Sequence, residues 1–184
     1  MVMQIANLAI SQLVIIDVQV KLAVAMPTTT MQQVAKNCGI LAQAALILNI
    51  PTLLTEQYPM GLGETLPEIK QYLVNVKPIT KTAFSACSEP KFNQRLSRDR
   101  SQLILTGMES HVCVLQTSLA LLQFSKQIFV VEDAIISRSE VNKNNALARM
   151  RDAGCVITNA ESVIFEWLGN ANHVQAKTLF NLIK

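Results

Sequence analysis

One segment of the chain decides its fold: Leu103-Ile104-Leu105-Thr106-Gly107-Met108-Glu109-Ser110-His111-Val112-Cys113-Val114-Leu115-Gln116. It begins as a short apolar run, typical of a buried parallel strand, and the run breaks at Gly107. Apolar residues then recur at helical spacing, and Glu109 or Ser110 is placed to cap the new helix. The pattern therefore predicts a strand, a sharp turn and a helix with Cys113 in its first turn.

Cys113 allows two interpretations at this point. Free backbone N–H groups and the positive end of the helix dipole lower the pKa of a thiol, and the thiolate is the nucleophile. The alternative is that Cys113 is a small buried hydrophobe beneath the helix, as most free cysteines are. The segment alone leaves both interpretations open.

Short apolar runs alternate with helical patterns along the rest of the chain. Strands are expected at 13–17, 51–55, 76–80, 103–106, 128–133 and 155–158. Helices are expected at 30–49, 67–74, 90–97, from 109 or 110 to at least 122, at 137–153, and twice after 158. Capping boxes are predicted for two of them, Thr30 with Gln33 and Ser137 with Glu140.

This alternation is typical of the α/β class. We predict a single domain over residues 1–184, built in three layers with Rossmann-like topology. Its mainly parallel sheet of about six strands should carry helices on both faces. Ligands bind such sheets at the carboxyl ends of the strands.

Composition excludes several classes of protein. Half of the 184 residues are hydrophobic and 16% are charged, which excludes a disordered chain. The net charge of +3 comes from scattered residues, so we expect no nucleic-acid partner. The longest apolar stretch, Leu41–Leu54, is interrupted by polar residues and a proline, which predicts no membrane span. With no signal peptide and no paired cysteines, a cytoplasmic location is expected.

The apolar surplus near the C-terminus predicts self-association. It comprises Val163, Ile164, Trp167, Leu168, Phe180, Leu182 and Ile183. Surplus apolar helix faces are often covered by another subunit, so we expect a homo-oligomer, at least a dimer. The alternative is that these residues pack beneath the edge of the sheet.

Three reactive side chains stand at predicted strand ends, namely Asp17, Lys81 and Cys113. Asp17 is suited to take the proton of the thiol, and Lys81 to stabilise the thiolate or a developing oxyanion. N–H groups at the start of the cysteine helix would complete an oxyanion hole. Lys81 taken alone would more often be a solvated lysine, and Asp17 could merely cap a turn.

Three segments resemble the signatures of the isochorismatase-like cysteine hydrolases, and the resemblance covers nearly the whole chain. They are Leu13-Val14-Ile15-Ile16-Asp17-Val18-Gln19, Lys81-Thr82-Ala83-Phe84-Ser85-Ala86 and Thr106-Gly107-Met108-Glu109-Ser110-His111-Val112-Cys113-Val114. Further segments resemble the isochorismatase domain-containing subgroup, namely Thr55-Glu56-Gln57-Tyr58-Pro59, Ser137-Arg138-Ser139 and Ala146-Leu147-Ala148-Arg149-Met150.

The resemblance implies a catalytic triad of Asp17, Lys81 and Cys113. It also implies a cis peptide bond between Met108 and Glu109, with the backbone N–H groups of Glu109 and Cys113 as oxyanion donors. Substrate-binding residues are expected at Gln19, Tyr58, Phe84 and Met108. Gln19 could instead support Asp17, and Tyr58 and Phe84 could simply pack.

Two departures from the resembled family narrow the chemistry. Nicotinamidases of the superfamily carry an Asp/His metal cluster after the second strand, where this chain has Glu56, Gln57 and Tyr58. We therefore expect no metal and no cofactor. True isochorismatases lack the cysteine, so Cys113 indicates amide or related acyl chemistry.

The sequence thus predicts a metal-independent cysteine hydrolase of a small carbonyl compound, such as an amide, carbamate or ester, working through an acyl-enzyme. One alternative is a binding or scaffold protein that kept the site without turnover. Another is a thiol redox module, which the absence of a nearby resolving cysteine disfavours.

The remaining polar and thiol residues are expected to have structural roles. His111 stands two positions before Cys113, so on a helix it points about 200° away and should be peripheral. Asp133 and Arg138 should order the loop after the fifth strand. Cys38 and Cys155 should lie in the core.

Overall fold

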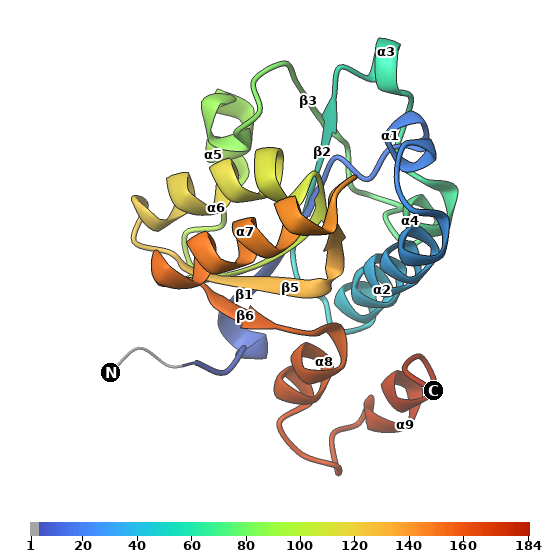
Figure 1. Ribbon diagram of the computed structural model, residues 1–184. Helices are drawn as coiled ribbons and strands as arrows, with labels where there is room; N and C mark the ends of the chain where they lie inside the picture. The colour runs from blue at the N-terminus through green and yellow to red at the C-terminus, as the bar shows by residue number, and fades with distance from the viewer. Residues whose placement is uncertain (1–3) are drawn as a thin grey trace.

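The computed structural model describes residues 4–184 and contains a six-stranded parallel sheet (Figure 1). Its strands lie in the order β3-β2-β1-β4-β5-β6. They are β1 (Ser11–Ile16), β2 (Thr52–Gln57), β3 (Ile79–Lys81), β4 (Gln102–Met108), β5 (Gln127–Ile136) and β6 (Val156–Thr158). The predicted α/β fold with a parallel sheet is confirmed.

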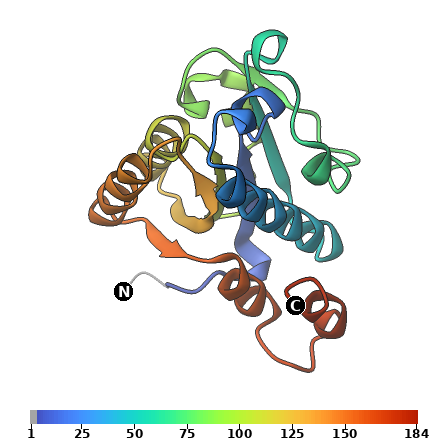
Figure 2. The same cartoon turned by 45° about the vertical axis from the view of Figure 1, so that its right-hand side comes forward.

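Helices cover both faces of this sheet (Figures 1 and 2). One face packs against α2 (Thr28–Ile47), α4 (Pro67–Lys70), α8 (Ala160–Leu168) and α9 (Ala176–Phe180). The other packs against α5 (Pro90–Arg95), α6 (Leu115–Leu122) and α7 (Glu140–Asp152). Two short helices, α1 (Val20–Val24) and α3 (Pro59–Leu62), lie in loops that follow β1 and β2.

The sheet separates two apolar cores because successive strand residues point to opposite faces. In β1, Leu13 and Ile15 join the core beneath α2, whereas Val14 and Ile16 join the core beneath α6 and α7. All six residues of β1 are buried. A strand covered on both faces reads as a continuous apolar run, which is why β1 and β4 could be located from sequence.

Both predicted capping boxes are wrong. Helix α2 already begins at Thr28, after Pro27, so Thr30 lies inside it, and Gln33 Nε2 donates to Asn37 Oδ1 instead. Helix α7 begins at Glu140 with Ser139 at the N-cap position and no side-chain cap bond, and Ser137 Oγ instead lies 3.0 Å from His111 Nδ1.

The bounds of several elements also differ from expectation, and β5, β3 and α4 show it most clearly. Strand β5 continues to Ile136, past the carboxylates that were expected to end it. Strand β3 covers only Ile79–Lys81 and ends on the lysine itself. Helix α4 stops at Lys70 rather than reaching residue 74.

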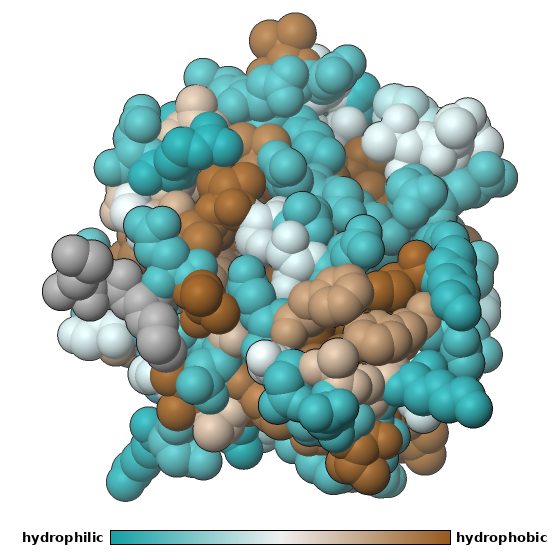
Figure 3. All heavy atoms as spheres, turned by 90° about the horizontal axis from the view of Figure 1, so that it is seen from below, coloured by the Kyte–Doolittle hydropathy of each residue, from teal (hydrophilic) through white to brown (hydrophobic). Residues whose placement is uncertain are grey.

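The C-terminal apolar residues are largely used within the chain. Val163, Ile164, Trp167 and Leu168 are buried in the core beneath the sheet, and Phe180, Leu182 and Ile183 pack against it. Figure 3 shows the molecule from below, on the side of α8 and α9, where several apolar areas lie among polar residues. These residues therefore pack within the chain, as the alternative interpretation had it. A homo-oligomer stays a prediction.

No helix within residues 4–184 combines the length and apolar character that crossing a bilayer requires.

Gly107 lets β4 pass close to β1 beside the candidate site. Its φ of +137° is one that L-residues rarely adopt, and an added Cβ would lie 2.1 Å from the carbonyl oxygen of Ile16. The register between β4 and β5 shifts at the same place, between Leu105 and Gly107. Only glycine fits both the backbone angle and the contact.

We predict that Gly107→Ala destabilises the fold far more than Gly154→Ala. Gly154 also has a positive φ (+101°), but a Cβ there would meet no atom within 4 Å. Gly154→Ala should therefore cost only the backbone strain, about 1–3 kcal/mol. Gly107→Ala should cost about 1–3 kcal/mol more, from overpacking against β1. Urea unfolding measures both values, and equal losses would refute a steric role for Gly107.

Candidate active site

The structure brings Asp17, Lys81 and Cys113 together at the carboxyl edge of the sheet. Asp17 follows β1, Lys81 ends β3, and Cys113 lies in the π-helical turn η3 (Ser110–Val114) after β4. Lys81 Nζ lies 2.7 Å from Asp17 Oδ2 and 3.6 Å from Cys113 Sγ. The ammonium group is thus a common neighbour of the carboxylate and the thiol.

Lys81 is held by oxygen acceptors on several sides. Its Nζ donates to Gln57 Oε1 at 2.6 Å and to the backbone oxygens of Ala83 and Phe84, both at 3.1 Å. The side chains of Lys81 and Asp17 are completely buried. A buried charge needs such partners, so the position of the ammonium group is fixed by the ends of β2 and β3.

Asp17 is fixed by the neighbouring strand β2. Its Oδ1 accepts from Thr55 Oγ1 at 2.7 Å, and its backbone N–H donates to the Thr55 carbonyl. Its φ is +53°, an unusual value for a residue other than glycine. Burial raises the pKa of Asp17 above 3.8, and Lys81 and Thr55 oppose this rise.

The expected lowering of the Cys113 pKa is not found. Burial is the largest influence on this thiol, and the charge of Asp17 adds to it, while Lys81 acts in the opposite direction. Together they raise the pKa of Cys113 to about 12. With such a pKa the thiol is neutral near pH 7, and it lies beside the carboxyl group of Asp17 and the ammonium group of Lys81.

The turn that carries Cys113 is organised around Glu109. The Met108–Glu109 peptide bond is cis, at the position that the resemblance implied. The Glu109 carbonyl accepts from the N–H groups of Val112 and Val114. The Glu109 side chain forms no helix cap, because its carboxylate pairs with Arg138 instead.

The four expected substrate-binding residues differ in their surroundings. Gln19 is fully engaged with loops: its Nε2 donates to the carbonyls of Gln57 and Gly63, and its Oε1 accepts from the Gln57 N–H. Met108 is buried in the apolar core. Tyr58 and Phe84 are 57% and 55% exposed. Only these last two present large surfaces to solvent.

Sequence reasoning missed two supporting residues, Thr55 and Gln57. Both lie at the end of β2, and Thr55 is the register partner of Ile16, the residue before Asp17. The signal that could have found them is their place at the same sheet edge. The sequence placed Thr55 at the end of the second strand and Gln57 at a position where nicotinamidases carry metal ligands, and neither was assigned a supporting role.

The residues expected to be structural have specific partners. Asp133 Oδ1 accepts from the N–H of Ala160 at the start of α8, whereas Arg138 binds Glu109. Cys38 and Cys155 are buried as predicted, and Cys87 is half-buried. Within residues 4–184, no group of three or more His, Cys, Asp or Glu side chains is arranged to hold a metal ion.

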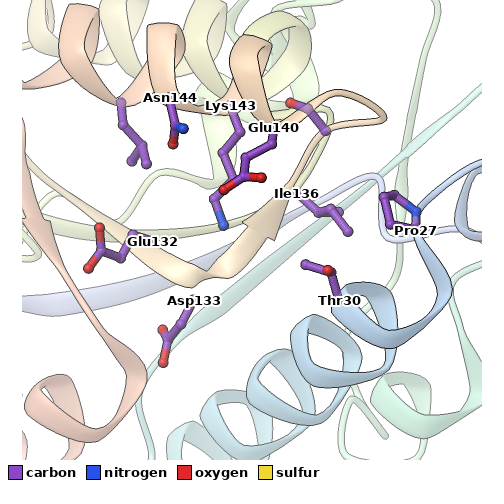
Figure 4. Close-up of a pocket in the computed structure, with 10 residues that line it drawn as sticks. Pro27, Thr30, Glu132, Asp133, Ile136, Glu140, Lys143 and Asn144 are labelled. Atoms are coloured by element: carbon purple, nitrogen blue, oxygen red, sulfur yellow. The ribbon is translucent and has the colours of Figure 1, made fainter.

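A cavity of about 510 Å³ lies beside this region, between α2 and α7 and over the end of β5 (Figure 4). Its lining comprises Pro27, Thr30, Glu132, Asp133, Ile136, Ser137, Glu140, Lys143, Asn144 and Leu147. None of the triad residues is among them, so it is separate from the Asp17–Lys81–Cys113 cluster.

Fold and site together define a three-layer α/β protein with a buried carboxylate, ammonium and thiol at the carboxyl edge of a parallel sheet. Residues 11–162 match the isochorismatase domain model, and the chain therefore belongs to this family of isochorismatase-like hydrolases. The isochorismatase domain-containing protein 2 of Bos taurus is 40% identical over 156 residues, which cover 83% of this chain and 74% of that protein.

Two solved structures are similar over almost their full length. The MAR1 ribonuclease from Caenorhabditis elegans has a TM-score of 0.92 and 37% identity, covering 97% of this chain and 91% of that one. YcaC from Pseudomonas aeruginosa, with hexane-2,5-diol and covalent acrylamide, has a TM-score of 0.88 and 25% identity, covering 100% and 97%.

Proposed function

We propose that this protein is a cysteine hydrolase that cleaves a small amide, carbamate or ester through a covalent acyl-enzyme. The observation that carries the proposal is the position of Lys81 Nζ, 2.7 Å from Asp17 Oδ2 and 3.6 Å from Cys113 Sγ. A general base, a nucleophile and a fixed positive charge are the groups that acyl transfer needs.

In the first half of the reaction, Asp17 accepts the proton of the Cys113 thiol while the sulfur attacks the carbonyl carbon of the substrate. The carbonyl π electrons move to the oxygen, and the N–H groups of Glu109 and Cys113 stabilise the resulting oxyanion. Collapse of this intermediate breaks the C–N or C–O bond. The leaving group departs with the proton that Asp17 took up, and a thioester remains on Cys113.

In the second half, water replaces the thiol as the nucleophile. Asp17 accepts a proton from the water as the water oxygen attacks the thioester carbon. The C–S bond then breaks, the sulfur regains a proton from Asp17, and the carboxylic acid product leaves. Lys81 keeps its charge throughout and balances the negative charge of Asp17 and of the sulfur. The reaction steps proposed here use no metal or cofactor.

The relatives suggest a test and a rival activity. Covalent acrylamide on YcaC shows that a protein of this fold reacts with a small electrophilic amide. The name of the Caenorhabditis elegans relative points instead to RNA cleavage. A thiol activated by a carboxylate is suited to attack a carbonyl carbon, so we favour carbonyl chemistry for this chain.

We predict that acrylamide modifies Cys113 in preference to Cys87, although Cys87 is the more exposed thiol. In the proposed mechanism Asp17 accepts the proton of Cys113. Burial raises the pKa of Cys87 to about 11, and within residues 4–184 its thiol donates to the Thr117 carbonyl rather than to a carboxylate. Peptide mapping by mass spectrometry after brief exposure measures both sites.

Cys87→Ala should leave this labelling unchanged, whereas Asp17→Asn should alter it. Equal, slow labelling of all four cysteines would favour the non-catalytic scaffold. Hydrolysis of RNA that depends on Cys113, without hydrolysis of small esters or amides, would favour the ribonuclease.

A further inference from the structure

We propose that Arg138 is a positioning residue, which holds the oxyanion side of the nucleophile turn through the side chain of Glu109. This inference rests on the proposed function, because it assigns a task to the Glu109 N–H. The two side chains are called the Glu109–Arg138 pair below.

Glu109 is anchored through both its backbone and its side chain. Its backbone carbonyl accepts from the N–H groups of Val112 and Val114, at 3.1 and 3.2 Å, and so sets the start of the turn that presents Cys113. Its side chain is 9% exposed, and its Oε1 accepts from Arg138 Nε. Movement of the side chain would therefore be transmitted to the peptide unit that carries the oxyanion donor.

Arg138 approaches Glu109 with both side chain and backbone. Its backbone N–H donates to Glu109 Oε2 at 3.2 Å, so the carboxylate is held by two donors of one residue. Arg138 stands just after β5, and the last β5 residue, Ile136, is the register partner of Met108. The two loops that leave β4 and β5 are thus joined at the point where the strands end.

A second contact between the same loops supports this arrangement. His111 Nδ1 lies 3.0 Å from Ser137 Oγ and 3.5 Å from Glu109 Oε2. His111 Nε2 lies 3.4 Å from Asn142 Nδ2 of α7. The nucleophile turn is therefore fastened through His111 to Ser137 and to Asn142 near the start of α7.

The arrangement exceeds what an ordinary surface ion pair would provide. The Arg138 side chain is 63% exposed, and such pairs contribute little when both partners are solvated. Here the carboxylate is almost buried and accepts charge-assisted bonds, which are shorter and stronger. Geometry near a reacting centre also matters more than stability, because small displacements of an oxyanion donor slow acyl transfer strongly.

The test compares two reagents that attack the same thiol. Acylation by p-nitrophenyl acetate creates an oxyanion, whereas alkylation by iodoacetamide displaces iodide at a saturated carbon and creates none. In Arg138→Gln, we expect acylation of Cys113 to slow by about tenfold or more. Alkylation should stay within about twofold of the wild-type rate. Arg138→Lys keeps the positive charge and a donor group, so its rate of acylation should fall between those of wild type and Arg138→Gln.

Arg151→Gln is the matched control, because Arg151 is an exposed arginine of α7 whose side chain forms no hydrogen bond or ion pair with the rest of residues 4–184. It should change neither rate. Equal rates of acylation in wild type and Arg138→Gln would overturn the inference. A parallel loss of acylation and alkylation would also overturn it, since that result would show general damage to the turn.

Hydrogen exchange provides the second measurement. Peptides that span residues 109–114 should exchange faster in Arg138→Gln than in wild type or Arg151→Gln, and unchanged exchange would contradict the inference. If wild type itself is not acylated at Cys113, the proposed function fails. The exchange result then still decides whether Arg138 holds the turn.

Discussion

Replacing Cys113 with serine is expected to reduce hydrolysis of a small ester or amide by about 10³-fold or more. A serine hydroxyl is far less acidic than a thiol, so Asp17 is too weak a base to generate the nucleophile. Cys113 is buried at the start of a helical turn, and serine is slightly smaller, so the fold should survive. Initial rates and thermal unfolding of the purified variant measure the two effects.

Cys87→Ser is the matched control, because Cys87 is a half-buried cysteine on the neighbouring segment η2 (Ala86–Ser88). It should retain wild-type turnover. A Cys113→Ser variant with wild-type activity would refute the nucleophile assignment. A loss of activity that accompanies unfolding would be separated from a chemical effect by comparing melting temperatures.

The second large effect is expected for Asp17→Asn, which removes the base but keeps the shape of the side chain. Turnover should fall by about 10²–10⁴-fold, the usual contribution of a general base. The proposed mechanism requires the Asp17 carboxylate, and burial raises the pKa of that group above 3.8. Wild-type activity should therefore be lost as the pH falls through this raised pKa and be retained above it.

The variant should lose that acidic limb, because the Cys113 thiol must then ionise by itself. Asp17 contributes to raising the pKa of Cys113 to about 12, so removing its charge lowers the pKa of the thiol. Rates measured as a function of pH locate the limb that reports Asp17 in wild type and the limb that reports the Cys113 thiol in the variant. Asp152→Asn, at the end of α7, is the control. An acidic limb that stays in place in Asp17→Asn would show that another group is the base.

The strands were predictable because burial on both faces leaves a simple record in sequence. Residues 13–16 and 103–106 are continuous apolar runs, and the structure has them within β1 and β4. The order of strands and helices followed, and with it the edge where Asp17, Lys81 and Cys113 meet. A parallel sheet thus determines where side chains gather before any contact is known.

Helix starts were less predictable because capping depends on which partner a side chain finds. Serine is a favoured N-cap residue, but the Ser137 hydroxyl instead contacts His111, which comes from a distant segment of the chain. Local pattern cannot exclude such a competitor. The same holds for Glu109, whose side chain could cap the turn but binds Arg138 instead.

The pKa of Cys113 shows a further limit of sequence reasoning. A helix N-terminus and a nearby lysine favour the thiolate, and both were visible in the sequence. Burial has the opposite effect and depends on the packed structure, where Cys113 is only 6% exposed. Its pKa consequently rises, which is why the mechanism proposed above relies on Asp17 as the base rather than on the helix dipole.

The central claim, a covalent acyl-enzyme on Cys113, is tested most directly by time-resolved mass spectrometry of the intact protein mixed with p-nitrophenyl acetate. We predict that one acetyl group appears on Cys113, reaches a steady level while p-nitrophenol is released, and disappears by hydrolysis when the ester is consumed. Turnover without any adduct, or an adduct that maps to another residue and persists in Cys113→Ser, would contradict the proposed mechanism.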